Sequence, residues 1–180
     1  MSRFRNVAVA CATVLVTLVC VSVVPASAMS SASVASSPLT EAKLASSDAR
    51  QLRRDVASSL GKYLTTYGDR FTSRETTKLE ELKSRADRQL GFVVLATNRL
   101  RWSIANGSSR AQVAAAGTAA QTTHKRARAT AEASFDQARA IVEPKLSLIE
   151  RIRALSDYNS MMDRFDALGD QLAAIAKQYQ

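Results

Sequence analysis

Chemically reactive side chains are scarce in this sequence. The only cysteines are Cys11 and Cys20, and His124 is the only histidine. A Cys/His zinc site cannot be assembled beyond Cys20, and no Glu-x-x-His pair is present for a di-iron bundle. A serine nucleophile would need His124 as its base, and no serine lies in a Gly-x-Ser-x-Gly turn. We therefore expect a protein that is not an enzyme and that has no metal or cofactor site.

Proline and strand-like patterns are also rare. The chain has three prolines, and none follows Pro144. No segment alternates apolar and polar residues between turns in the manner of a strand. We predict an all-α fold for residues 38–180, an elongated antiparallel bundle of four long helices with a central hairpin that resembles a coiled coil.

The first residues have the pattern of a secretory signal peptide, predicted over 1–28. Arg3 and Arg5 precede an apolar run from Val7 to Val24, and Ala26-Ser27-Ala28 has the small-x-small cleavage pattern. The run is almost long enough to span a bilayer, so an uncleaved N-terminal anchor is the alternative. Residues 29–37 are small and polar and are predicted to be a disordered leader. Cleavage would remove both cysteines, and helix packing alone would then hold the exported fold.

The chain is strongly basic. It has 25 Lys and Arg residues against 16 Asp and Glu residues, and loss of Arg3 and Arg5 would leave a net charge of about +7. Outside the cytoplasm the available polyanions are anionic lipids, wall polymers and acidic glycans, so we do not expect a nucleic-acid partner. The excess of arginine over lysine and the abundance of alanine are typical of high-GC bacteria.

The segment from Thr72 to Gly107 is predicted to be the central helix. Its apolar stripe repeats at steps of three and four residues: Leu79, Leu82, Ala86, Leu90, Val93, Thr97, Leu100 and Ile104. Thr72 and Glu75 can form a capping box, and Asn106-Gly107 is a left-handed stop. Phe92, Leu95 and Trp102 widen the apolar surface, so we expect this half of the helix to lie deepest in the core.

Three further helices are expected around it. The first begins at Ser37-Pro38 and ends near Tyr67. The third begins with a capping box of Ser109 and Gln112 and ends at Glu143-Pro144, and most of its seam positions are alanine. The region after Pro144 is either one helix or two that break at 156–160. Its predicted stripe is Leu148, Ile152, Leu155, Met162, Phe165, Leu168, Leu172, Ile175 and Tyr179.

The central hairpin lacks acidic residues between Asp87 and Glu132. The basic residues of this stretch are Arg88, Arg99, Arg101, Arg110, Lys125, Arg126 and Arg128. With Trp102, which could insert at a membrane interface or stack on a ligand, they form a candidate site for an anion, a lipid or a protein partner. The alternative is a solvated basic face with Trp102 in the core.

Other polar or adaptable residues have simpler interpretations. His124 is either a buried seam residue or a pH sensor that charges as the pH falls through about 6.5. Asp163, Asp166 and Asp170 fall on one helical face, which is typical of a solvated face rather than a calcium site. Met161-Met162 could fill the core or bind clients adaptably.

These observations favour an exported, non-enzymatic cell-envelope protein that acts through protein contacts, as a scaffold, adaptor or chaperone-like binder. The alternative is a helical protein that binds lipid or an anionic membrane surface. In size, charge and predicted helicity the chain is similar to exported envelope chaperones. Expected partners are an envelope protein, an anionic lipid or a wall polymer, or a second copy of the chain.

Overall fold

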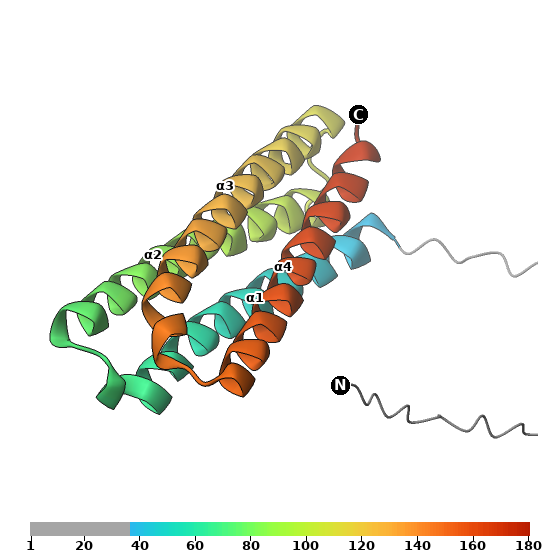
Figure 1. Ribbon diagram of the computed structural model, residues 1–180. Helices are drawn as coiled ribbons and strands as arrows, with labels where there is room; N and C mark the ends of the chain where they lie inside the picture. The colour runs from blue at the N-terminus through green and yellow to red at the C-terminus, as the bar shows by residue number, and fades with distance from the viewer. Residues whose placement is uncertain (1–36) are drawn as a thin grey trace, which may run out of the picture. The chain divides into compact units, whose positions relative to one another are not determined.

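The computed structural model describes residues 37–180, and these residues form four α-helices. The helices are α1 (Pro38–Tyr67), α2 (Ser73–Ala105), α3 (Arg110–Val142) and α4 (Leu148–Lys177). They run up and down in chain order, as Figure 1 shows, and the prediction of an all-α antiparallel bundle is confirmed. The predicted signal peptide (1–28) and residues 29–36 of the predicted leader lie outside the described residues.

Side-chain caps define where the helices begin. The Thr72 and Glu75 side chains form a capping box at α2, and Ser109 and Gln112 form one at α3, as the sequence predicts. Ser147 caps α4 with Glu150, a signal that the sequence reading did not use. Because each box satisfies backbone N–H groups that a helix start leaves unpaired, these positions fix the boundaries.

The core follows the predicted stripes of α2 and α3. Seven of the eight predicted α2 positions are buried: Leu79, Leu82, Ala86, Leu90, Val93, Thr97 and Leu100. Ile104 is half-buried beside the turn. On α3 the seam residues Ala120, Ala127 and Ala131 are fully buried, and a Cβ added at Gly117 would lie 3.0 Å from the Ala176 Cβ of α4. The α3 seam therefore packs closely rather than leaving the core loose.

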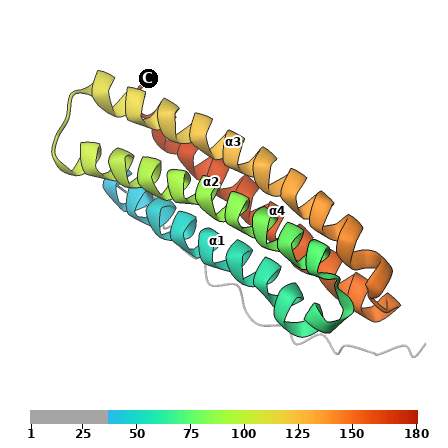
Figure 2. The same cartoon turned by 90° about the vertical axis from the view of Figure 1, so that its left-hand side faces the viewer.

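Each helix packs against its two neighbours in the order α1, α2, α3, α4 around the bundle. Arg53 of α1 donates to Asp87 of α2, Gln171 of α4 donates to Asp48 of α1, and α3 and α4 are joined by Arg128 and Asp166. Figure 2 shows the α2–α3 turn at one end and the α1–α2 and α3–α4 connections at the other. The outer faces of α2 and α4 therefore lie at opposite corners of the bundle.

α4 is one continuous helix, which settles the choice between one helix and two after Pro144. The short 3-10 turn Glu143–Lys145 separates it from α3. Pro144, at the second position of this turn, has no backbone N–H group that would need an acceptor. The chain can therefore reverse here without losing a helical hydrogen bond.

Candidate functional site

His124 is a buried seam residue between α3 and α4. Its side chain is 4% exposed, and its Nε2 lies 2.9 Å from the Phe165 carbonyl oxygen. Because a carbonyl can only accept, the neutral ring holds its proton on Nε2 and donates to Phe165. A Cβ at Gly169 would lie 2.9 Å from the His124 Cε1 atom, so a glycine at this position makes room for the ring.

The electrostatic setting of His124 favours the neutral ring. Burial lowers its pKa, the hydrogen bond to Phe165 raises it in part, and Arg128 lowers it again. Asp166 raises this pKa and Lys125 lowers it, both by smaller amounts. A buried imidazole that resists protonation contributes to packing at neutral pH and becomes unfavourable in acid.

The basic residues predicted to form one site do not share one surface. Arg110 donates to the Tyr179 carbonyl oxygen at 3.1 Å, and Arg128 donates to Asp166 at 2.7 Å and to Glu132 at 3.2 Å, so both point toward α4 or stay on α3. Lys125 and Arg126 are exposed on α3, and Arg101 is half-buried. Arg88 and Arg99 are exposed on α2. The bundle therefore leaves only part of the predicted set on any one surface.

Trp102 does not lie in the core, and Phe92, Leu95 and Trp102 do not widen the buried surface of this half of α2 as expected. Trp102 is 65% exposed, and Phe92 and Leu95 are also exposed. At about 100° per residue, Trp102 lies opposite the buried Val93, nine residues earlier on the helix. The α2 strip, as we name this outer row, consists of Arg88, Phe92, Leu95, Arg99 and Trp102.

The first half of α4 also departs from prediction. Leu148 is 73% exposed, and Ile149, Ile152 and Leu155 are exposed beside it, although three of these four were expected in the core. No residue from Leu148 to Ser160 is buried, whereas the second half of the helix buries Phe165, Leu168, Leu172 and Ile175. The α4 strip, as we name it, consists of Leu148, Ile149, Ile152 and Leu155.

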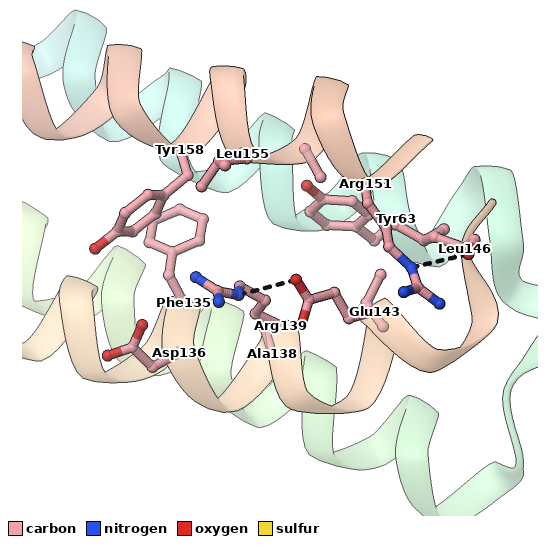
Figure 3. Close-up of a pocket in the computed structure, with 12 residues that line it drawn as sticks. Tyr63, Phe135, Asp136, Ala138, Arg139, Glu143, Leu146, Arg151, Leu155 and Tyr158 are labelled. Carbon is pink, nitrogen blue, oxygen red and sulfur yellow. Dashed lines mark hydrogen bonds and ion pairs between the residues drawn. The ribbon is translucent and has the colours of Figure 1, made fainter. Parts of the chain in front are cut away.

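A pocket opens beside the α4 strip, between α3, α4 and the C-terminal part of α1. Figure 3 shows the aromatic rings of Tyr63, Phe135 and Tyr158 around it, with Leu155 at the α4 side. Val142 and Leu146 also contribute to the apolar lining of this small hollow, which is open to solvent. Phe135 and Tyr158 meet edge to face, with ring centroids 5.7 Å apart. Leu155 thus joins the pocket and the strip into one apolar surface.

Charged side chains surround the pocket. Arg139 pairs with Glu143 at 3.2 Å, and Arg151 donates from Nε to the Leu146 carbonyl oxygen at 3.1 Å (Figure 3). Burial raises the pKa of Tyr63 to about 12, with smaller contributions from Asp157 and Tyr67, so its hydroxyl remains a neutral donor. An apolar floor with a polar rim is the usual composition of a site that accepts an apolar side chain or a small apolar ligand.

The acidic row of α4 lies beyond the α4 strip, in the second half of the helix. Asp163, Asp166 and Asp170 are exposed. The hydrogen bond from Arg128 lowers the pKa of Asp166. Within residues 37–180 no group of three or more His, Cys, Asp or Glu side chains is arranged to hold a metal ion.

Met161 and Met162 are buried at the middle of α4. Of the two interpretations of this pair, the structure shows the one in which methionines fill gaps in the core. Their flexible side chains lie where the exposed first half of the helix meets the buried second half.

Neither the pocket nor the α4 strip is predicted as a candidate site by the sequence patterns. The signal available was the presence of Leu148, Ile149 and Ile152 close together at a helix start, which is more apolar surface than one seam can bury. The pocket itself joins residues from three helices, and no local pattern marks such a combination.

Comparison of the chain with protein-family models, with curated proteins and with solved structures gives no match. Among the described helices, none is long and apolar enough to cross a membrane. The class of protein that can be assigned is therefore that of its fold, a helical bundle, and its function has to be argued from its surfaces.

Proposed function

We propose that this protein is an exported, non-enzymatic protein of the cell envelope that acts through protein contacts, as a scaffold, adaptor or chaperone-like binder. The observation that carries the proposal is the α4 strip, which is exposed and continuous with the apolar pocket. Exposed apolar surface of this kind marks interaction sites in soluble proteins. Export is inferred from the N-terminal sequence pattern, and the absence of enzymatic activity from the shortage of catalytic side chains.

The arrangement of the surface favours a partner with an amphipathic helix or an extended apolar segment. One apolar side chain of the partner would enter the pocket between Phe135 and Tyr158, and others would cover Ile152 and Leu148 along the helix. Anchors buried in pockets and surrounded by a rim usually supply most of an interface's binding energy. The fold loses little by leaving the four residues of the α4 strip exposed, because none of them is buried in the bundle.

Site-directed photo-crosslinking tests the proposal. A photoreactive residue at Ile149 should capture a discrete partner from native envelope extract, or a second copy of the chain. The same residue at Ala129, which is exposed on the outer face of α3, serves as the matched control. Light scattering of the purified protein would separate self-association from binding of another protein. A strict monomer that crosslinks at neither position, or equally at both, would contradict the proposal.

A further inference from the structure

We propose that the α2 strip is a second binding surface, which docks the bundle onto an anionic phospholipid bilayer with α2 parallel to the membrane plane. The residues of the strip recur at steps of four, three, four and three, which places all five on one line along the helix. The line is about 21 Å long at 1.5 Å per residue. It lies on the side of α2 opposite the buried Val93, so the whole length can meet a flat surface at once.

The apolar members of the strip have the composition of a membrane-interface anchor. Phe92, Leu95 and Trp102 are 49%, 57% and 65% exposed. Aromatic rings with one polar edge are favoured at the level of lipid head groups, and a flat amphipathic helix face inserts its apolar side chains just below them. A row of single side chains is a poor pocket for a protein anchor but is suited to a fluid surface.

The charges around these side chains are complementary to phosphate head groups. Arg88 and Arg99 have no hydrogen-bond or ion-pair partner within residues 37–180, so both guanidinium groups are available to lipid. On the α1 side, a shallow groove that contains Phe92 and Leu95 is lined by Arg53 and Arg88. The one carboxylate there, Asp87, is neutralised by Arg53 through hydrogen bonds of 2.7 and 2.8 Å. The α2 strip is therefore basic as well as apolar.

The opposite corner of the bundle carries the opposite charge. Asp163 and Asp170 lie on the outer face of α4, diagonally across from the α2 strip, whereas Asp166 between them is paired with Arg128 of α3 at 2.7 Å. An anionic membrane would attract the α2 face and repel the carboxylates of Asp163 and Asp170, which gives the bundle a defined orientation. In that orientation the α4 strip points away from the bilayer and stays open to a protein partner. The inference thus goes beyond the proposed protein contacts and does not depend on them.

Vesicle binding by matched variants tests the inference. The α2 variant Phe92→Ser/Arg99→Ser/Trp102→Ser removes two large apolar side chains and one arginine. The control Ile149→Ser/Ile152→Ser/Arg153→Ser removes the same classes from α4, also at exposed positions. Both variants are made in the full-length protein, with the N-terminus that the protein has when it is isolated from cells. The probes are vesicles of phosphatidylcholine alone, vesicles that also contain phosphatidylglycerol, and soluble inorganic polyphosphate.

The wild-type chain and the control are expected to bind the phosphatidylglycerol vesicles at low salt. The α2 variant should bind them about ten-fold more weakly or worse, since one arginine near an anionic surface contributes about 1 kcal/mol and each buried apolar group adds to it. Trp102 is the only tryptophan. Its emission should therefore shift to the blue when wild-type protein binds vesicles, because the indole enters the interface.

Three results would overturn the inference. These are no binding to anionic vesicles, equal loss of binding in both variants, or binding of polyphosphate and vesicles alike without any shift of Trp102 emission. The last result would identify a soluble polyanion as the partner instead of a bilayer. Because the α2 variant leaves Ile149 intact, its crosslinking to a protein partner shows separately whether the proposed protein contacts hold.

Discussion

The two halves of α4 have similar apolar content and opposite roles. From Leu148 to Ser160 the large apolar side chains face solvent, and from Met161 onward they fill the core. The halves belong to one unbroken helix with one set of neighbours. Apolar residues in a helix therefore do not by themselves identify the core. In this bundle the second half of α4 stabilises the fold, and the first half supplies surface.

The largest expected difference is in the cost of truncating side chains in the two halves. Phe165→Ala should lower the free energy of unfolding by about 3–5 kcal/mol, because Phe165 is fully buried and its loss leaves a cavity. Ile152→Ala should change it by no more than about 0.5 kcal/mol, because Ile152 faces solvent. Urea unfolding of both variants measures the contrast. Similar losses in both would mean that the first half is part of the core.

A smaller effect is expected where α4 crosses α3. Gly169→Ala should destabilise the protein by about 1–3 kcal/mol, since its new methyl group would press on the His124 ring. Ser156→Ala, at an exposed position in the first half, is the control and should be neutral or slightly stabilising. Thermal unfolding compares them. If His124→Ala does not relieve the effect of Gly169→Ala, the proposed clash is not its cause.

The start of the first half should depend on its cap more than on packing. Ser147→Ala removes the side chain that accepts from the Glu150 N–H, at a cost of about 1 kcal/mol. Since few buried contacts hold this segment, the loss should appear as faster hydrogen exchange from Leu148 to about Ser160. Exchange in the second half should stay as slow as in the wild type. Uniform acceleration along the helix would show that the two halves unfold together.

The smallest effect is expected from pH and should act on the second half of α4 through His124. Burial lowers the pKa of His124 in the folded state, so the unfolded chain takes up this proton first. Its contribution to stability is thus complete above about pH 6.5, the ordinary pKa, and falls as the pH drops below that value. Glu75, whose pKa is lowered to about 2 by its Thr72 backbone hydrogen bond, affects stability only below its ordinary pKa of 4.5.

The histidine effect is measured by comparing the stability of the wild-type and His124→Gln proteins between about pH 6.5 and pH 4.5, the ordinary pKa values of His124 and Glu75. The wild type should lose stability as the solution is acidified toward pH 5, and His124→Gln should remain nearly flat. An equal slope in both proteins would assign the dependence to other groups. It would also remove His124 as a candidate pH sensor.

Much of the fold follows from local signals that the sequence displays. The capping boxes at Thr72 and Ser109 predict two helix starts, and the three-and-four spacing of α2 predicts its buried stripe, because both depend only on residues within a few turns. The prediction for the first half of α4 failed for a geometric reason. Leu148 and Leu155 continue a seven-residue spacing to Met162, yet a straight helix drifts about 20° per heptad from such a repeat.

This drift and the angular position of Ile152 explain why the α4 strip faces solvent. At about 100° per residue, Ile152 lies about 140° around the helix from Phe165, so both cannot face the same core. Which of the two faces is buried depends on neighbouring helices. The candidate surfaces were predictable only in part for the same reason: Arg88, Arg99 and Trp102 were found from charge and composition, while the pocket between Tyr63, Phe135 and Tyr158 exists only after three helices pack.

The most direct test of the central claim, that the exposed first half of α4 serves binding rather than folding, is the yield of the Ile149 crosslink in the Leu148→Ser/Ile152→Ser variant. We expect this variant to unfold at the wild-type denaturant concentration and to lose most of the crosslinked partner. A variant that keeps its partner but unfolds at much lower denaturant would contradict the claim, because the strip would then belong to the core.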